Sequence, residues 1–236
     1  MQTVYWGFPV TQELYTRLDS IISQTRTAQG ADKQLNKALS DAVYELVKEG
    51  LQAYYHGPTQ LLPMNPSKQK AFDSGVKVIT GAIKLVIGKF FGSLDPQRLL
   101  AVANYVDDLL HAPAGAEPAR LMFALEPALQ QRVSFSLQQV CDQDVTEQDI
   151  QDLIKAMQQI VQVSIRHYYE QPADLVSLGR ITRSVTDLAI RNVQKAFDSF
   201  LEKMLSKLDH ENVTKLSDYL GSMLHEPAEK RRQAVG

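Results

Sequence analysis

The sequence predicts an all-α fold in which two tandem copies of an approximately four-helix unit form a pseudo-two-fold helical bundle. Three observations lead to this prediction. Apolar residues recur along most of the chain with the i, i+3, i+4, i+7 spacing of amphipathic helices. No stretch alternates with the period of a strand, and no Asn-Gly or Asp-Gly hairpin turn occurs. Segments of the first half recur at a fixed offset in the second half.

The repeat has an offset of 114 residues. Its most specific matches are Tyr54 with Tyr168, Tyr55 with Tyr169, Tyr105 with Tyr219, and His111 with His225. Both tyrosine pairs are followed by x-x-Pro, and both histidines by x-Pro-Ala. This register defines a first unit at residues 3–116, a second unit at 117–230 and a polar tail at 231–236. It leaves open whether the units fold separately or share one core.

Each unit is expected to contain four helices. In the first unit, apolar spacing places three of them around residues 14–22, 35–54 and 72–90. In the second unit, the corresponding segments are 121–137, 150–168 and 188–204. The fourth helix starts at Asp95 in one unit and at Asp209 in the other, because aspartate is a preferred N-cap and Pro96 suits the first helical position.

Proline and glycine distinguish the two units. No proline lies between Pro172 and Leu208, which predicts one continuous helix over this run. The third helix of the first unit carries Gly75, Gly81 and Gly88. Because glycine costs up to about 1 kcal/mol inside a helix, we expect another helix to pack closely against these positions.

The N-terminal segment is unusually aromatic. At the repeat offset, the aromatic residues Tyr5, Trp6 and Phe8, beside Pro9, have no aromatic counterpart in the second unit. We expect this segment to form a strap over an apolar groove. Trp6 and Phe8 are therefore candidates for contact with a partner or a membrane.

Composition excludes several classes of protein. The 236 residues include 44% hydrophobic and 22% charged residues, which disfavours a disordered chain. Mean hydropathy is −0.22 and no apolar run is long enough to span a bilayer. A net charge of −2 disfavours nucleic acid as a partner. One cysteine, Cys141, cannot form an internal disulfide, and the N-terminus does not resemble a secretory signal, so we expect a cytoplasmic protein.

The Tyr-Tyr-x-x-Pro segments have two interpretations. Their phenols can contact a ligand or partner, or each ring can cap the bundle with its hydroxyl bonded to a backbone carbonyl. Occurrence in both units favours the structural interpretation. His167 and Glu170 beside the second pair could serve as a general acid and base, although no third catalytic group is evident.

The sequence also raises the possibility of a metal site. Asp107, Asp108 and His111 lie within about one helical turn, and carboxylates with imidazole bind divalent metals. The second unit keeps His225 but has Gly221 and Ser222 at the carboxylate positions. The simpler interpretation is a histidine near the C-terminal end of a helix. No cofactor and no catalytic residue is assigned.

Residues 68–91 predict a basic amphipathic helix. Lys70, Lys77, Lys84 and Lys89 lie along it, and no acidic residue occurs between Asp73 and Asp95. Such a helix can lie on an anionic membrane surface or in an acidic groove. It can equally be a core helix with a solvated lysine edge.

Three functions remain open. The leading hypothesis is a non-enzymatic binding, regulatory or adaptor protein that presents a surface between its two units to a protein partner or a second copy, or holds a small apolar ligand there. The alternative is peripheral membrane or lipid binding through residues 68–91. The third is a helical-bundle enzyme or metal-binding protein that uses His111 or His167.

Overall fold

The structure is a computed structural model that describes residues 3–28, 30, 32–61, 66–91, 94–112, 117–141, 145–205 and 208–226. Within these ranges, the side chains of residues 66–75, 78, 79, 82 and 181 are not included. The described chain is mostly helical and also contains a small four-stranded sheet. The all-α prediction is therefore approximately correct, with the sheet as the exception.

Within the described ranges, four long helices lie in each half of the sequence. The first half contains α1 (Gln12–Thr27), α2 (Lys33–Leu51), α4 (Pro66–Phe91) and α5 (Pro96–Leu109). The second half contains α6 (Pro127–Gln139), α7 (Glu147–Ile165), α9 (Arg180–Leu205) and α10 (His210–Gly221). Helix α2 continues into the π-helical turn η1 (Gln52–His56) and the short α3 (Gly57–Gln60). Helix α7 likewise continues into η2 (Arg166–Glu170) and α8 (Gln171–Leu175).

The predicted helix starts are confirmed. The Asp95 carboxylate accepts a hydrogen bond of 2.9 Å from the backbone N–H of Arg98, and Pro96 is the first residue of α5. Asp209 accepts one of the same length from the N–H of Asn212 at the start of α10. Each cap satisfies a backbone donor that the helix itself cannot pair.

The sheet contains β1 (Tyr5–Val10), β2 (Leu110–His111), β3 (Ala119–Ala124) and β4 (Leu224–His225), in the order β2-β3-β1-β4 with antiparallel pairs. We expected neither β1 nor β3, and had assigned residues from 121 onward to a helix. One face of each strand is buried, and the other face is buried only at its centre, at Gly7 and Met122, although both sequences are nearly continuous apolar runs. Such runs lack the period of two, so spacing alone cannot distinguish them from helix.

The strap prediction for the N-terminal segment is wrong. Residues 5–10 form a central strand whose middle, Gly7 and Phe8, pairs with Met122 and Leu121 of β3. A Cβ atom on Gly7 would lie only 2.2 Å from the Leu121 carbonyl oxygen, so this close approach requires glycine.

Two further expectations about the helices are also wrong. The run after Pro172 is not one helix: α8 ends at Leu175, Ser177 adopts a positive φ of 50°, and α9 starts at Arg180. Nothing lies within 4 Å of a Cβ built on Gly81 or Gly88, so no other part of the described chain packs against them. The surroundings of Gly75 lie outside the described part of the structure.

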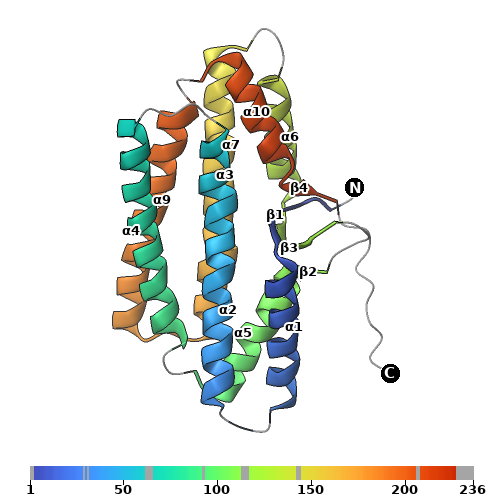
Figure 1. Cartoon of the computed structure of the whole chain (residues 1–236), viewed down its shortest axis with the longest axis vertical. Coiled ribbons are helices and arrows are strands. Elements are labelled where there is room, and N and C mark those ends of the chain that lie inside the picture. The colour runs from blue at the N-terminus through green and yellow to red at the C-terminus, as the bar shows by residue number, and fades with distance from the viewer. Residues whose placement is uncertain are drawn as a thin grey trace.

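The elements form a tall molecule with three layers (Figure 1). Helices α4 and α9 pack together on one side, α2 and α7 occupy the middle, and the sheet lies on the other side with α1, α5, α6 and α10. One hydrophobic cluster joins the two halves and includes Trp6, Leu39, Phe123, Leu153 and Leu216. None of the helices within the described ranges is both long and apolar enough to cross a membrane.

Candidate functional site

An aromatic cluster lies where the middle helices meet the sheet. The Trp6 ring stacks on the Tyr54 ring with a centroid distance of 6.4 Å. Phe8 makes edge contacts with both Tyr54 and Tyr168, at 5.4 and 6.3 Å. Phe123 of β3 completes the group with an edge contact to Tyr168 at 5.5 Å. The cluster therefore joins β1 and β3 to both π-helical turns.

The Tyr-Tyr pairs predicted to end two helices lie on these π-helical turns. Tyr54 and Tyr55 belong to η1, and Tyr168 and Tyr169 belong to η2. π-Helical turns are rare and occur often at functional sites, because the extra residue redirects side chains. Here the first tyrosine of each pair points into the cluster, while Tyr55 and Tyr169 contact the outer helices.

Three polar atoms in this cluster have no full hydrogen bond to any residue that the structure describes. They are the Trp6 Nε1, the Tyr54 hydroxyl and the Tyr168 hydroxyl, and all three are buried. The Tyr54 hydroxyl lies close enough to the Tyr168 hydroxyl and the Trp6 Nε1 for weak polar contacts with both, but neither contact has the geometry of a full hydrogen bond. Burial raises the pKa of Tyr54 and Tyr168 well above the ordinary value, so both phenols are neutral. An unpaired buried polar group costs about 1–3 kcal/mol.

Tyr105 and Tyr219 hold the π-helical turns of the opposite halves. The Tyr105 hydroxyl lies 2.9 Å from the backbone carbonyl oxygen of His167 in η2 and 2.5 Å from Gln171 Oε1, and it donates its single proton between these two acceptors. The Tyr219 hydroxyl donates a hydrogen bond of 2.8 Å to the carbonyl of Ala53 in η1. Burial, followed by the nearby charge of Asp108, raises the pKa of Tyr105 to about 12. These tyrosines provide the phenol-to-carbonyl bonds that we had predicted for the Tyr-Tyr pairs.

The second tyrosine of each pair anchors the outer layer. Tyr55 is buried and packs against Phe197 and Phe200 of α9, with centroid distances of 5.5 and 4.7 Å. The Tyr169 hydroxyl lies 2.6 Å from the Asp187 carboxylate and 2.6 Å from the Thr186 hydroxyl. Burial, followed by the bond to Asp187, raises the pKa of Tyr169 to about 12.

Both repeated histidines lie at the sheet. His111 in β2 is buried, and its ring makes an edge contact with Tyr5 at 5.0 Å. His225 in β4 is the pairing partner of Tyr5, and its Nε2 lies 3.2 Å from the Glu117 carboxylate. Each histidine therefore has structural contacts at one end of β1.

The metal site and the acid–base pair that the sequence analysis raised as possibilities are not assembled among the described residues. Among the described residues, no three His, Cys, Asp or Glu side chains gather as they would around a metal ion. The Asp107 carboxylate instead forms an ion pair of 2.6 Å with Arg26. His167 stacks on Phe123 at 4.7 Å, and its pKa is lowered by burial and then by the charge of Arg166, while Glu170 is exposed.

A second candidate site is the outer surface of α4 and α9, which we call the outer face. Its exposed cations are Lys77, Lys84, Lys89, Arg191, Lys195 and Lys203. None of these six forms an ion pair with another described residue. The Lys70 side chain lies outside the described residues. The sequence had pointed to the lysines of α4 but not to the contribution of α9.

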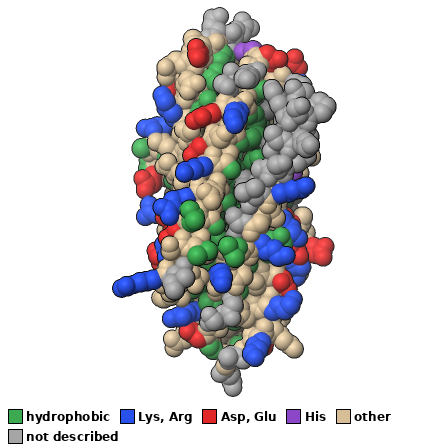
Figure 2. Space-filling model, turned by 90° about the vertical axis from the view of Figure 1, so that its left-hand side faces the viewer, with side chains coloured by type: hydrophobic (Ala, Val, Ile, Leu, Met, Phe, Trp, Pro, Cys, Tyr) green, Lys and Arg blue, Asp and Glu red, His purple; other side chains and the backbone are tan. Residues whose placement is uncertain are grey.

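The outer face also exposes aliphatic side chains. Leu85 of α4 is 43% exposed, and Val185 and Leu188 of α9 are 43% and 56% exposed. Figure 2 views the molecule from the side of α4 and α9 and shows hydrophobic side chains along the middle of this view, with Lys and Arg among and beside them and with Asp and Glu interspersed. The opposite side of α4 is in the core, where Val86, Ile87, Phe90 and Phe91 are buried. Trp6 and Phe8 are 1% and 2% exposed, so neither offers surface to a partner.

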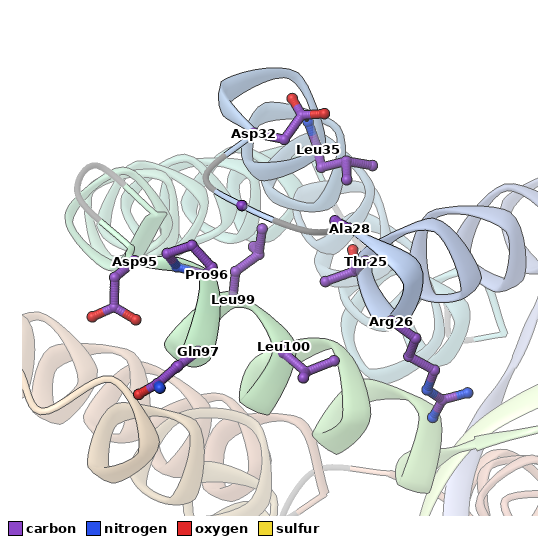
Figure 3. Close-up of a pocket in the computed structure, with 11 residues that line it drawn as sticks. Thr25, Arg26, Ala28, Asp32, Leu35, Asp95, Pro96, Gln97, Leu99 and Leu100 are labelled. Atoms are coloured by element: carbon purple, nitrogen blue, oxygen red, sulfur yellow. The ribbon is translucent and has the colours of Figure 1, made fainter.

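A pocket of about 490 Å³ lies between the end of α1 and the starts of α2 and α5 (Figure 3). Its lining includes Leu35, Leu99 and Leu100 and comes entirely from the first half of the chain, so this pocket is not the site between the two units that the sequence analysis considered for a small apolar ligand. Its carboxylates, Asp32 and Asp95, already cap α2 and α5. Both described carboxylates of the pocket therefore stabilise the start of a helix.

Sequence reasoning missed Phe123 as a member of the aromatic cluster, and it missed His167 as the ring that stacks on Phe123. Phe123 aligns with Pro9 at the repeat offset, so comparison of the units concealed that it faces Trp6 across β1 and β3. The apolar run at residues 121–125 was the available signal, but it was interpreted as helix.

Comparison with known proteins adds no relative: no family model, no curated protein and no solved structure matches this chain.

Proposed function

We propose that this chain is a non-enzymatic binding or adaptor protein whose contact surface is the outer face. The observation that carries the proposal is the group of six exposed cations, which lack ion-pair partners among the described residues and lie on the same two helices as exposed Leu85, Val185 and Leu188. Exposed aliphatic residues rimmed by charge are typical of interaction surfaces. The excess of positive charge favours a negatively charged partner.

The sites that could have supported catalysis favour a structural interpretation. Asp107 is neutralised by Arg26, and Tyr105 and Tyr219 bond to backbone carbonyls. The His167 ring stacks on Phe123 rather than lying opposite a described nucleophile. These side chains hold the fold that presents the outer face.

We also propose that the chain arose by tandem duplication. The starts of β1 and β3, of α2 and α7, of η1 and η2, and of β2 and β4 each differ by 114 residues, the offset found in the sequence. The bonds of Tyr105 to His167 and of Tyr219 to Ala53 differ by the same offset at both ends. Under this proposal α4 and α9 are equivalent helices, so the outer face lies between the two units.

Site-specific photo-crosslinking in cells tests the proposed contact surface. Benzoylphenylalanine at position 188 of the outer face should give a covalent adduct with the partner. The same group at Ser20, an exposed residue of α1 on the other side of the molecule, is the matched control. The double variant Lys84→Glu/Lys195→Glu should abolish the adduct at position 188. No adduct, or adducts of equal yield at positions 20 and 188, would contradict the proposal.

A further inference from the structure

We infer that the partner of the outer face is the surface of an anionic lipid bilayer. This inference rests on the function proposed above and identifies the partner by its chemistry. It starts from the charges. Between Gly75 and Leu94 the sequence has Lys77, Lys84 and Lys89 but no acidic residue. On α9, Asp187 is already held by Arg183 and Tyr169, which leaves Asp198 and Glu202 to oppose the basic residues.

The cations are distributed along the face rather than gathered at one point. Lys77 to Lys89 on α4 and Arg191 to Lys203 on α9 each extend over about 18 Å, at 1.5 Å per residue. The two helices pack side by side, so these rows lie next to each other. A distributed array of cations can meet many lipid headgroups at once, whereas a site for one phosphate group needs converging donors.

The exposed aliphatic residues supply the second component of membrane binding. Leu85 is adjacent in sequence to Lys84, and Leu188 lies one helical turn before Arg191. This arrangement lets aliphatic side chains enter the headgroup region while the long basic side chains extend to anionic headgroups. Gly81 and Gly88, which face open space, add no side chain that would hold the helix away from a flat surface.

The buried side of α4 limits how deeply the protein can bind. Val86, Ile87 and Phe90 are 7–9% exposed and belong to the core cluster shared by both halves. Only the outer edge of α4 is therefore available to the bilayer. We expect shallow binding that depends strongly on salt, because attraction between exposed charges is screened within about 8 Å at physiological ionic strength.

Vesicle flotation with the full chain tests the inference. The protein should float with vesicles of phosphatidylcholine containing 30% phosphatidylglycerol at low salt, and not with phosphatidylcholine alone. Lys84→Glu/Lys195→Glu should weaken the partition coefficient by about tenfold or more. The control Lys33→Glu/Arg132→Glu makes the same change in net charge on α2 and α6, at exposed residues without ion pairs among the described chain, and should float like the wild type.

A second readout keeps the natural charges. Trp6 is the only tryptophan and is buried, so Leu188→Trp adds a reporter whose emission should shift to the blue on anionic vesicles. No flotation and no shift at low salt would overturn the inference. If a protein adduct at position 188 were still formed in cells and lost on charge reversal, the contact surface would stand with an acidic protein as its partner. If that adduct were also absent, the proposed function would fail as well.

Discussion

The Tyr105 hydroxyl of α5 donates a hydrogen bond to the backbone carbonyl of His167, which lies in the other half of the chain. Tyr219 makes the reciprocal bond to the Ala53 carbonyl. Each bond ties a fourth helix to a π-helical turn whose carbonyls lack the regular pattern of an α-helix. The two tyrosines therefore fasten the halves to each other at two places.

Tyr105→Phe and Tyr219→Phe should each lower the free energy of unfolding by about 1–2 kcal/mol, because a partly buried carbonyl loses its donor. Urea denaturation followed by circular dichroism measures the change. Tyr44→Phe is the matched control, since the Tyr44 ring contacts Lys48 and its hydroxyl has no bond among the described residues. A loss no larger than that of the control would mean that these bonds do not fasten the halves.

Tyr168→Phe should have the opposite sign. The Tyr168 hydroxyl is buried and makes no full hydrogen bond to a described residue, because its contact with the Tyr54 hydroxyl falls short of that geometry. Its removal should therefore relieve a desolvation cost while the ring contacts with Phe8 and Phe123 remain. We expect the free energy of unfolding to rise by up to about 1 kcal/mol. Thermal unfolding of this variant beside Tyr105→Phe provides the comparison. A marked destabilisation would show that the hydroxyl is bonded in solution, for example to an internal water molecule.

High pH should destabilise the protein through its tyrosines. The pKa values of Tyr105 and Tyr169 are raised to about 12 from the ordinary 10.0. Between pH 10 and 12 the folded state therefore retains protons that the unfolded state releases, and stability falls as pH rises. Denaturation at pH 9, 10 and 11 should show this slope. Tyr169→Phe should reduce it, and an unchanged slope would contradict the proposed contribution of Tyr169.

Replacing Gly7 or Gly81 by alanine should change the free energy of unfolding in opposite directions. A Cβ at Gly7 would lie 2.2 Å from the Leu121 carbonyl, so Gly7→Ala should separate β1 from β3 and cost about 3 kcal/mol or more. Gly81→Ala meets open space on a helix and should raise the free energy of unfolding by about 0.5–1 kcal/mol. Chemical denaturation of both variants checks the pair. Destabilisation by Gly81→Ala would mean that something packs against this position.

The helices were predictable from sequence because their signals are local. Apolar spacing and the caps at Asp95 and Asp209 act within a few residues. The strands were not, because β1 and β3 are stabilised by each other across more than a hundred residues and leave no alternating pattern. Tyr54 and Tyr168 could be identified because they recur at the repeat offset. Their contacts with Trp6, Phe8 and Phe123 could not be predicted, because these contacts depend on how segments far apart in the sequence pack together.

The outer face was predictable in part for a similar reason. The lysines of α4 stand out because no acidic residue interrupts them. The basic residues of α9 are mixed with Asp187, Asp198 and Glu202 along the sequence, so their net effect depends on which side of the helix each occupies. Their position beside the lysines of α4 follows from the packing of α4 on α9.

The order of the sheet predicts that neither half folds alone. Strand β1 pairs with β3 and β4, and β2 pairs with β3, so every strand pair in the described sheet joins one half to the other. The two halves also share one hydrophobic cluster.

When residues 1–114 and 115–236 are produced as separate chains, each as a monomer should lack a cooperative unfolding transition, because its strands have no partners and its core is half exposed. Mixed at equal concentration, they should form a one-to-one complex with a single transition that depends on concentration. Analytical ultracentrifugation and thermal unfolding measure both properties. A half that unfolds cooperatively as a monomer would show that it has an independent core and that strand pairing between the two halves is not required for folding.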